Sequence, residues 1–117
     1  MENEFSKKLK IKMDQYAHLV YDVTKKFPKD ELYGATSQLR RSALSVILNY
    51  IEGFARQKRA VKRNFWEISY GSLKESKYLL HFSLVEKYLG AKDYKEAINL
   101  SEEIGAMLWK SIQSIKE

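Results

Sequence analysis

One stretch of the chain, residues 36–53 (TSQLRRSALSVILNYIEG), constrains the fold more than any other. Read at about 100° per residue, its apolar side chains fall on one side of a helix. They are Leu39, Ala43, Val46, Ile47, Tyr50 and Phe54. The opposite side is a stripe of mostly small or amide-bearing residues: Gln38, Ser42, Ser45, Asn49, Glu52 and Arg56. Exposed helix faces usually carry charged side chains, so this stripe predicts close contact with another helix.

Recurring apolar residues predict four helices in all, including the one that contains residues 37–53. We expect helices over residues 3–27, 37–57 and 61–89, and a fourth from residue 92 or 93 to 115. The predicted core stripe of the third helix is Val61, Phe65, Ile68, Ser72, Tyr78 or Leu79, Phe82, Val85 and Leu89. Because the links are short, the most economical architecture is all-α, an antiparallel up-down-up-down four-helix bundle. A chain of 117 residues fits one domain, residues 1–117.

Several residues predict where the helices begin and end. Pro28 should stop the first helix, because proline disfavours helical geometry at the residue before it. Thr36 suits the N-cap position of the second predicted helix. Asp93 suits the N-cap position of the fourth, because Glu96 follows three residues later as in a capping box. Gly90 suits the residue after the third helix.

Two glycines lie inside predicted helices. Gly53 indicates either a fraying point or a close approach by another backbone, and the sequence leaves both open. Gly71 costs roughly 1 kcal/mol relative to alanine in mid-helix. We expect a close helix crossing at Gly71 to offset that cost.

The composition narrows the class of protein. There are no cysteines, so disulfides and thiolate metal sites are excluded. The N-terminal residues lack the apolar core of a signal peptide, and no 18-residue apolar run exists. We therefore expect a cytoplasmic protein without a membrane partner.

Basic residues are concentrated in one segment of a chain whose formal net charge is +6. Residues 56–64 (RQKRAVKRN) hold five basic residues and no acid. Such a cluster is typical either of a solvated helix junction or of a surface for nucleic acid. The candidate RNA contacts are Arg56, Lys58, Arg59, Lys62 and Arg63, together with Arg40 and Arg41 if they are exposed.

No residue pattern points to catalysis, a cofactor or a small-molecule substrate. Glu52 could act as a base, but its motif contains no histidine. His18 and His81 lie far apart and lack a metal-binding context, so we expect no metal and no enzyme activity. The aromatic residues Trp66, Tyr70, Tyr78 and Trp109 could stack bases, but at helical spacing they more often form core or interface.

A long motif in the chain resembles a known family. The segments FPKDELYGATSQLRRSALSVILNYIEG and FWEISYGSLKE follow a recurring pattern in the 23S rRNA intervening-sequence proteins. The matching residues of the first segment are Phe27, Pro28, Glu31, Tyr33, Gly34, Thr36, Gln38, Arg40, Arg41, Ser42, Ser45, Asn49, Glu52 and Gly53. Gly71, Ser72 and Glu75 match in the second. The resemblance covers roughly residues 5–115.

The resemblance implies a four-helix bundle that assembles as a homopentamer, with no catalytic activity. The family is also similar to the accessory variability proteins of diversity-generating retroelements, which bind a reverse transcriptase and nucleic acid. The structural or interface motif then comprises Gln38, Ser45, Asn49, Glu52, Gly53, Gly71, Ser72 and Glu75. The alternative to an RNA role for Arg40 and Arg41 is an ion pair with Glu75 or Glu52 across helices, and we expect one of the two arginines to pair with Glu75.

Two functions remain open from the sequence. The first is a non-enzymatic, oligomeric binding or scaffold protein whose basic surface contacts RNA or an RNA–protein complex. The second is a protein–protein interaction module with no nucleic-acid role, in which the positive charge only aids solubility.

Overall fold

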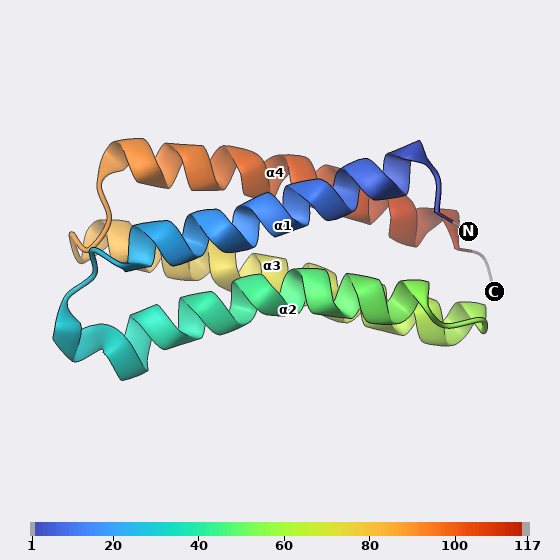
Figure 1. Ribbon diagram of the computed structural model, residues 1–117, viewed down its shortest axis with the longest axis horizontal. Helices are drawn as coiled ribbons and strands as arrows, with labels where there is room; N and C mark the ends of the chain where they lie inside the picture. Colours follow the sequence, from blue (N-terminus) through green and yellow to red (C-terminus); the bar gives the residue numbers. More distant parts are fainter. Residues whose placement is uncertain (1, 116–117) are drawn as a thin grey trace.

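Four helices form an antiparallel bundle measuring 44 × 24 × 18 Å (Figure 1). This computed structural model describes residues 2–115. The helices are α1 (Glu4–Thr24), α2 (Ser37–Phe54), α3 (Arg59–Val85) and α4 (Ala91–Ser114). Two short turns, η1 (Lys29–Glu31) and η2 (Leu32–Thr36), connect α1 to α2. The predicted all-α four-helix bundle is confirmed; residues 1 and 116–117 of the predicted domain lie outside the described part.

The core is built from apolar residues that recur at helical spacing in all four helices. In α1 these are Leu9, Met13, Tyr16 and Val20, in α2 Leu39, Ala43 and Val46, in α3 Leu73 and Leu80, and in α4 Ala97, Ile104 and Leu108. All of these side chains are fully buried. Burial of this kind is the main contribution to folding of such a bundle.

The third helix presents a different face to the core from the predicted one. Its buried residues are Trp66, Ser69, Ser72, Leu73, Ser76, Leu80 and Ser83. Of the predicted core residues, Val61, Ile68, Phe82 and Val85 are exposed instead, whereas Ser72 and Leu89 are buried as predicted. The serines can be buried because their hydroxyls are hydrogen-bonded. Ser76 and Ser83, for example, donate to the carbonyls of Leu73 and Leu79.

The start of α2 is not capped as predicted. Thr36 itself has helical backbone angles, and its side chain caps nothing. Instead, the Glu31 carboxylate accepts a hydrogen bond from the amide of Ala35, at 3.1 Å. A side-chain capping box does occur at the start of α1, between Asn3 and Ser6.

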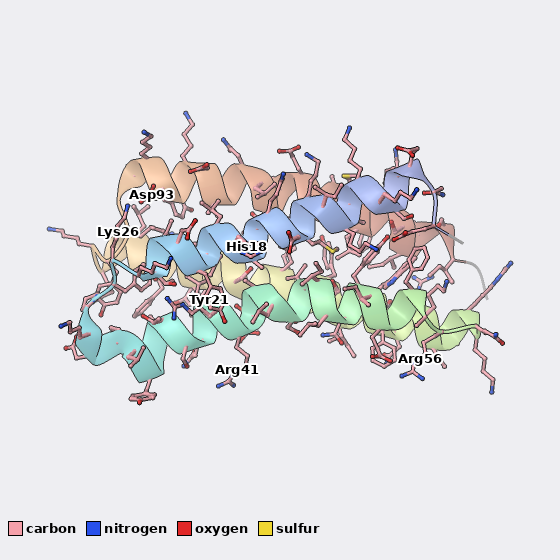
Figure 2. The ribbon with its side chains drawn as sticks, in the orientation of Figure 1. His18, Tyr21, Lys26, Arg41, Arg56 and Asp93 are labelled. Atoms are coloured by element: carbon pink, nitrogen blue, oxygen red, sulfur yellow. The ribbon has the colours of Figure 1, made fainter. Side chains whose placement is uncertain are left out.

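The predicted roles of Gly90 and Asp93 at the α3–α4 turn are wrong. The residue after α3 with left-handed backbone is Lys87, at φ 65°, and Gly90 is the N-cap of α4. Because α4 begins at Ala91, Asp93 lies inside its first turn. The Asp93 carboxylate lies 3.4 Å from the Lys26 ammonium, which ties α4 to the end of α1 (Figure 2).

Candidate functional site

The polar stripe of α2 contacts α3 directly. The Asn49 amide donates to the Ser45 hydroxyl at 2.9 Å, and the Ser45 and Ser72 hydroxyls lie 2.7 Å apart. Nearby, the Ser69 hydroxyl donates to the carbonyl of Val46 on α2 at 2.6 Å. These small side chains allow the two helices to pack closely, as the sequence predicts for this stripe.

Gly53 is a point of close approach. A Cβ atom added there would lie 2.6 Å from Trp66 Cδ1 and 3.0 Å from the Lys62 carbonyl oxygen. The Trp66 indole donates to the Tyr50 carbonyl at 3.1 Å, and the Trp66 and Tyr50 rings stack with centroids 5.1 Å apart. The close crossing expected at Gly71 is absent, because nothing lies within 4 Å of an added Cβ there.

Arg40 is held against α1 and does not pair with Glu75. Its guanidinium donates to the Thr24 hydroxyl at 2.8 Å and lies 4.6 Å from the Tyr21 ring centroid. Arg41 and Glu75 are both exposed, and within residues 2–115 no ion pair joins either arginine to Glu75. The expected pair is therefore wrong for the single chain. Arg40 instead locks α2 to the last turn of α1.

The five residues of the basic cluster gather at the α2–α3 turn, near the start of α1 and the end of α4 (Figure 1). Lys58, the residue before α3, is exposed, and so is Arg59, the first residue of α3. Arg56 forms an ion pair with Glu52 and contacts the Phe65 ring. We call this region, which comprises Arg56, Lys58, Arg59, Lys62 and Arg63, the basic end.

Two of the basic-end residues make further contacts. Arg63 lies 3.3 Å from the Glu67 carboxylate and donates to the Ile115 carbonyl at 3.0 Å. The Lys62 ammonium lies 5.1 Å from the Phe54 ring centroid.

The seven predicted RNA contacts do not form one patch. Figure 2 shows Arg41 and Arg56 pointing away from the bundle, Arg41 from α2 and Arg56 from the α2–α3 turn just beyond its end. Fifteen residues separate them, which corresponds to about 22 Å along a helix. Because Arg40 is occupied by α1, only the basic end is a clustered candidate. Gln38 is exposed near the start of α2, outside the Asn49–Ser45–Ser72 chain of hydrogen bonds.

An exposed apolar surface runs along α2 and α3. Its members are Leu48 and Ile51 on α2, which are 59% and 45% exposed, and Ile68, Tyr78, Phe82 and Val85 on α3, which are 44%, 63%, 37% and 61% exposed. Leu48 lies one turn after Ser45 on α2, and Ile68 lies one turn before Ser72 on α3; the Ser45 and Ser72 hydroxyls touch. Because the two helices are antiparallel, both steps lead toward the α2–α3 turn, so Leu48 and Ile68 lie at the same level of the bundle. The surface therefore crosses the groove between the helices. We call it the α2–α3 apolar face.

A cavity of about 340 Å³ opens beside the basic end, between the start of α1, the α2–α3 turn and the end of α4. Four rings line it, those of Phe5, Tyr50, Phe54 and Trp66. Its cationic lining residues are Lys62 and Lys110, and none of its lining residues within the described part of the chain is a carboxylate. Sequence reasoning missed this cavity, because its residues come from all four helices. We call it the terminal pocket.

Burial affects the chemistry of Tyr50. Loss of solvent around its hydroxyl, helped by the negative charge of Glu2, raises the pKa of Tyr50 to about 12. Glu2 is itself paired with Lys10, and this hydrogen bond lowers the pKa of Glu2. Tyr50 therefore remains neutral under ordinary conditions.

The predicted metal and aromatic candidates are dispersed. His18 lies 3.4 Å from Asp14 on α1, with both side chains exposed (Figure 2), whereas His81 lies beside Tyr78 on α3. In the described part of the chain no three His, Cys, Asp or Glu side chains gather as metal ligands would. Trp66 is buried, Tyr70 packs against Trp109, and Tyr78 is exposed.

No helix within residues 2–115 is long and apolar enough to span a membrane.

Comparison with known proteins identifies the family. Comparison with curated proteins finds no match. A crystal structure of a protein of unknown function from the S23 ribosomal protein family of Bacteroides thetaiotaomicron VPI-5482 superposes with a TM-score of 0.84 at 24% sequence identity. The match covers 91% of this chain and 99% of that chain, so the two share a fold. The model of the 23S rRNA-intervening sequence protein family matches residues 7–110. The chain belongs to this family, whose name assigns no enzymatic activity.

Proposed function

We propose that the protein is a non-enzymatic scaffold that self-associates through the α2–α3 apolar face and contacts RNA, or an RNA–protein complex, through the basic end. The observation that carries this proposal is the separation of two surfaces, one apolar along α2 and α3 and one basic at the bundle end. The proposal includes the expected homopentamer, a cytoplasmic location and a similarity to the accessory variability proteins of diversity-generating retroelements.

The apolar face supports self-association on physical grounds. Several large apolar side chains exposed on one side of a bundle indicate an interaction site. The exposed charges of Arg41 and Glu75 lie in the same rows, seven residues from Leu48 and Ile68. Here Tyr78 and Val85 are each more than 60% exposed, and Gly71 lies on the same side of α3 with open space around it. Because a Gly in mid-helix costs roughly 1 kcal/mol, a second copy that packs against Gly71 would supply an offset that the single chain lacks.

The basic end supports an RNA contact. Lys58 is exposed, and a chain with a formal net charge of +6 attracts polyanions over long range. RNA that is held by such lysines and arginines must release counterions, so its affinity falls steeply with salt.

A second function is favoured by a specific observation. Arg56 is paired with Glu52 and Arg63 with Glu67, so at least two of the five cations already have acidic partners. That arrangement suits a protein–protein module in which charge aids solubility only.

The test measures mass and RNA binding together. Light scattering would be recorded with and without structured RNA at low and moderate salt, alongside fluorescence anisotropy of labelled RNA. The double variant Lys58→Glu/Arg59→Glu alters the basic end. Lys8→Glu/Lys92→Glu makes the same change in net charge on α1 and α4, where both lysines are exposed.

We expect an oligomer whose RNA affinity falls with salt and falls much further in the basic-end variant than in its control. Equal losses in both variants would indicate general attraction to charge and would contradict a contact at the basic end. An oligomer that is indifferent to RNA at every salt concentration would favour the protein-binding module.

A further inference from the structure

We propose that the terminal pocket binds one unstacked nucleotide unit, with the base against its aromatic walls and the phosphate at Lys62 and Lys110. The unit can come from single-stranded RNA or from a free nucleotide, since both present the same ring and phosphate. The inference deepens the proposed RNA contact and rests on it for the RNA source.

The aromatic walls suit a planar base. Tyr50 and Trp66, which are 2% and 6% exposed, stack on each other at an interplanar angle of 18° and form the buried side of the pocket. The ring of this group that a base can reach is the half-buried Phe54, whose centroid lies 6.2 Å from that of Trp66. Phe5, from the start of α1, completes the wall and is 39% exposed. Aromatic side chains bind unpaired bases because every base has a π face, whereas the bases of a duplex are already stacked.

The charges of the pocket suit an anion. Lys62 lies 5.1 Å and 5.6 Å from the Phe54 and Trp66 ring centroids, so its ammonium stands directly beside the aromatic wall. Lys110 on α4 is exposed and also lines the pocket. Among residues 2–115 the lining holds two cations and no carboxylate, so the pocket favours a ligand that combines an aromatic ring with negative charge.

Hydroxyl groups give the pocket hydrogen-bond acceptors. The Ser111 and Ser114 hydroxyls each donate to a carbonyl of their own helix, so the lone pairs of their oxygens are left to accept. Base edges carry amino and imino donors that such acceptors can bind. The volume of about 340 Å³ lies within the range of small-molecule sites.

A second cavity links the pocket to the basic end. It measures about 400 Å³ and shares Lys62, Trp66 and Ser114 with the terminal pocket. Arg59 and Gln57 line its far side. A strand with one base in the terminal pocket would therefore lay its neighbouring phosphates along the basic end.

The test uses Trp66 as a reporter. The chain has two tryptophans, so the variant Trp109→Phe isolates the fluorescence of Trp66. Adenosine monophosphate, single-stranded oligoadenylate, duplex RNA and ribose 5-phosphate would be titrated into this protein. We expect saturable quenching by the first two, and none by ribose 5-phosphate, which lacks a base.

Two pairs of variants locate the site, with circular dichroism to verify folding. Ser114→Phe fills the pocket and should weaken binding by about tenfold, the scale of one lost base stack. Gln113→Phe, at the adjacent exposed position, should leave binding unchanged. Lys110→Met should weaken binding of adenosine monophosphate severalfold, whereas Lys92→Met, an exposed lysine on the same helix, should not.

The outcomes separate this inference from the proposed function. Salt-dependent RNA binding without Trp66 quenching, unaffected by Ser114→Phe, would overturn the pocket and leave the RNA scaffold standing. Quenching by adenosine monophosphate that Ser114→Phe abolishes, without RNA binding, would support the pocket as a free-nucleotide site and contradict the RNA contact. Absence of any quenching and any RNA binding would overturn both.

Discussion

At the scale of single residues, Tyr16 couples stability to pH. Its fully buried hydroxyl lies 2.7 Å from that of Ser76, which donates in turn to the Leu73 carbonyl. Burial raises the pKa of Tyr16 to about 12, against an ordinary value of about 10. A raised pKa contributes stability that is fully present below the unfolded value and is lost as pH rises through the folded value.

We therefore expect the wild-type protein to lose up to about 3 kcal/mol of unfolding free energy at this one site between pH 10 and 12. At pH 8 the Tyr16→Phe variant should have an unfolding free energy about 1 kcal/mol lower than wild type, because the hydrogen bond to Ser76 is lost. Above pH 10 its unfolding free energy should fall less steeply with pH than that of wild type. Urea unfolding at pH 8, 10 and 11 measures both effects. Tyr33→Phe, at a position 90% exposed, should not change stability at pH 8; parallel pH profiles for wild type and Tyr16→Phe would contradict the assignment.

Lys87 carries a second residue-scale prediction. It closes α3 in a Schellman motif, with the amide of Tyr88 bonded to the Ser83 carbonyl at 2.8 Å and its own amide to Leu84 at 3.1 Å. Its φ of 65° is one that glycine adopts without strain. Lys87→Gly should therefore raise the unfolding free energy by about 1 kcal/mol. Glu86→Gly, one residue earlier at φ −76°, should lower it; a shift in the same direction for both would argue against backbone strain at Lys87.

At the scale of elements, the α2–α3 crossing depends on Gly53. An alanine methyl there would meet Trp66 and the Lys62 carbonyl at 2.6 Å and 3.0 Å, so Gly53→Ala should destabilise the bundle by roughly 1–3 kcal/mol through overpacking. Gly105→Ala on α4 is the matched control, because its methyl would meet Leu73 at an ordinary 3.5 Å. That variant should gain up to about 1 kcal/mol from helix propensity. Thermal unfolding of both variants, compared with wild type, tests the opposite signs.

Helix patterns predicted the bundle, but they could not orient α3. Its two faces compete: one carries Ile68, Phe82 and Val85, and the other carries Ser69, Ser76 and Ser83 between Leu73 and Leu80. A hydrophobic count favours the first face. The structure buries the second, because a serine hydroxyl that bonds to a backbone carbonyl behaves as a small packing group.

The candidate sites were predictable to different degrees. The basic end is one continuous segment, residues 56–63, and could be read directly from the sequence. The terminal pocket joins Phe5 to Lys110, and no local pattern reports that such distant residues meet. Arg40 or Arg41 was expected to pair with Glu75, but Arg40 contacts Thr24 and Tyr21 on α1 instead, which only the packing of α1 against α2 reveals.

At the scale of the whole molecule, the orientation of α3 determines which apolar surface is exposed for contact with other chains. Because the serine face is turned inward, the larger apolar side chains lie outside and form the α2–α3 apolar face. A monomer would leave this surface in water, at roughly 25 cal/mol for each Å² of apolar area. A second copy that covers it removes that cost, whereas a charge placed within it opposes assembly.

If the chain self-associates through this face as proposed, Ile68→Glu should dissociate the assembly while its helical content is kept, since Ile68 is 44% exposed and lies outside the buried core cluster. Ile11→Glu is the matched control: Ile11 on α1 is 57% exposed and outside the apolar face, so that variant should assemble as wild type does. Light scattering measures the mass and circular dichroism the helicity. An assembly that survives Ile68→Glu but is lost in Ile11→Glu would move the interface from α2–α3 to α1. Loss of helicity in Ile68→Glu at low protein concentration would instead mean that folding of the chain depends on assembly.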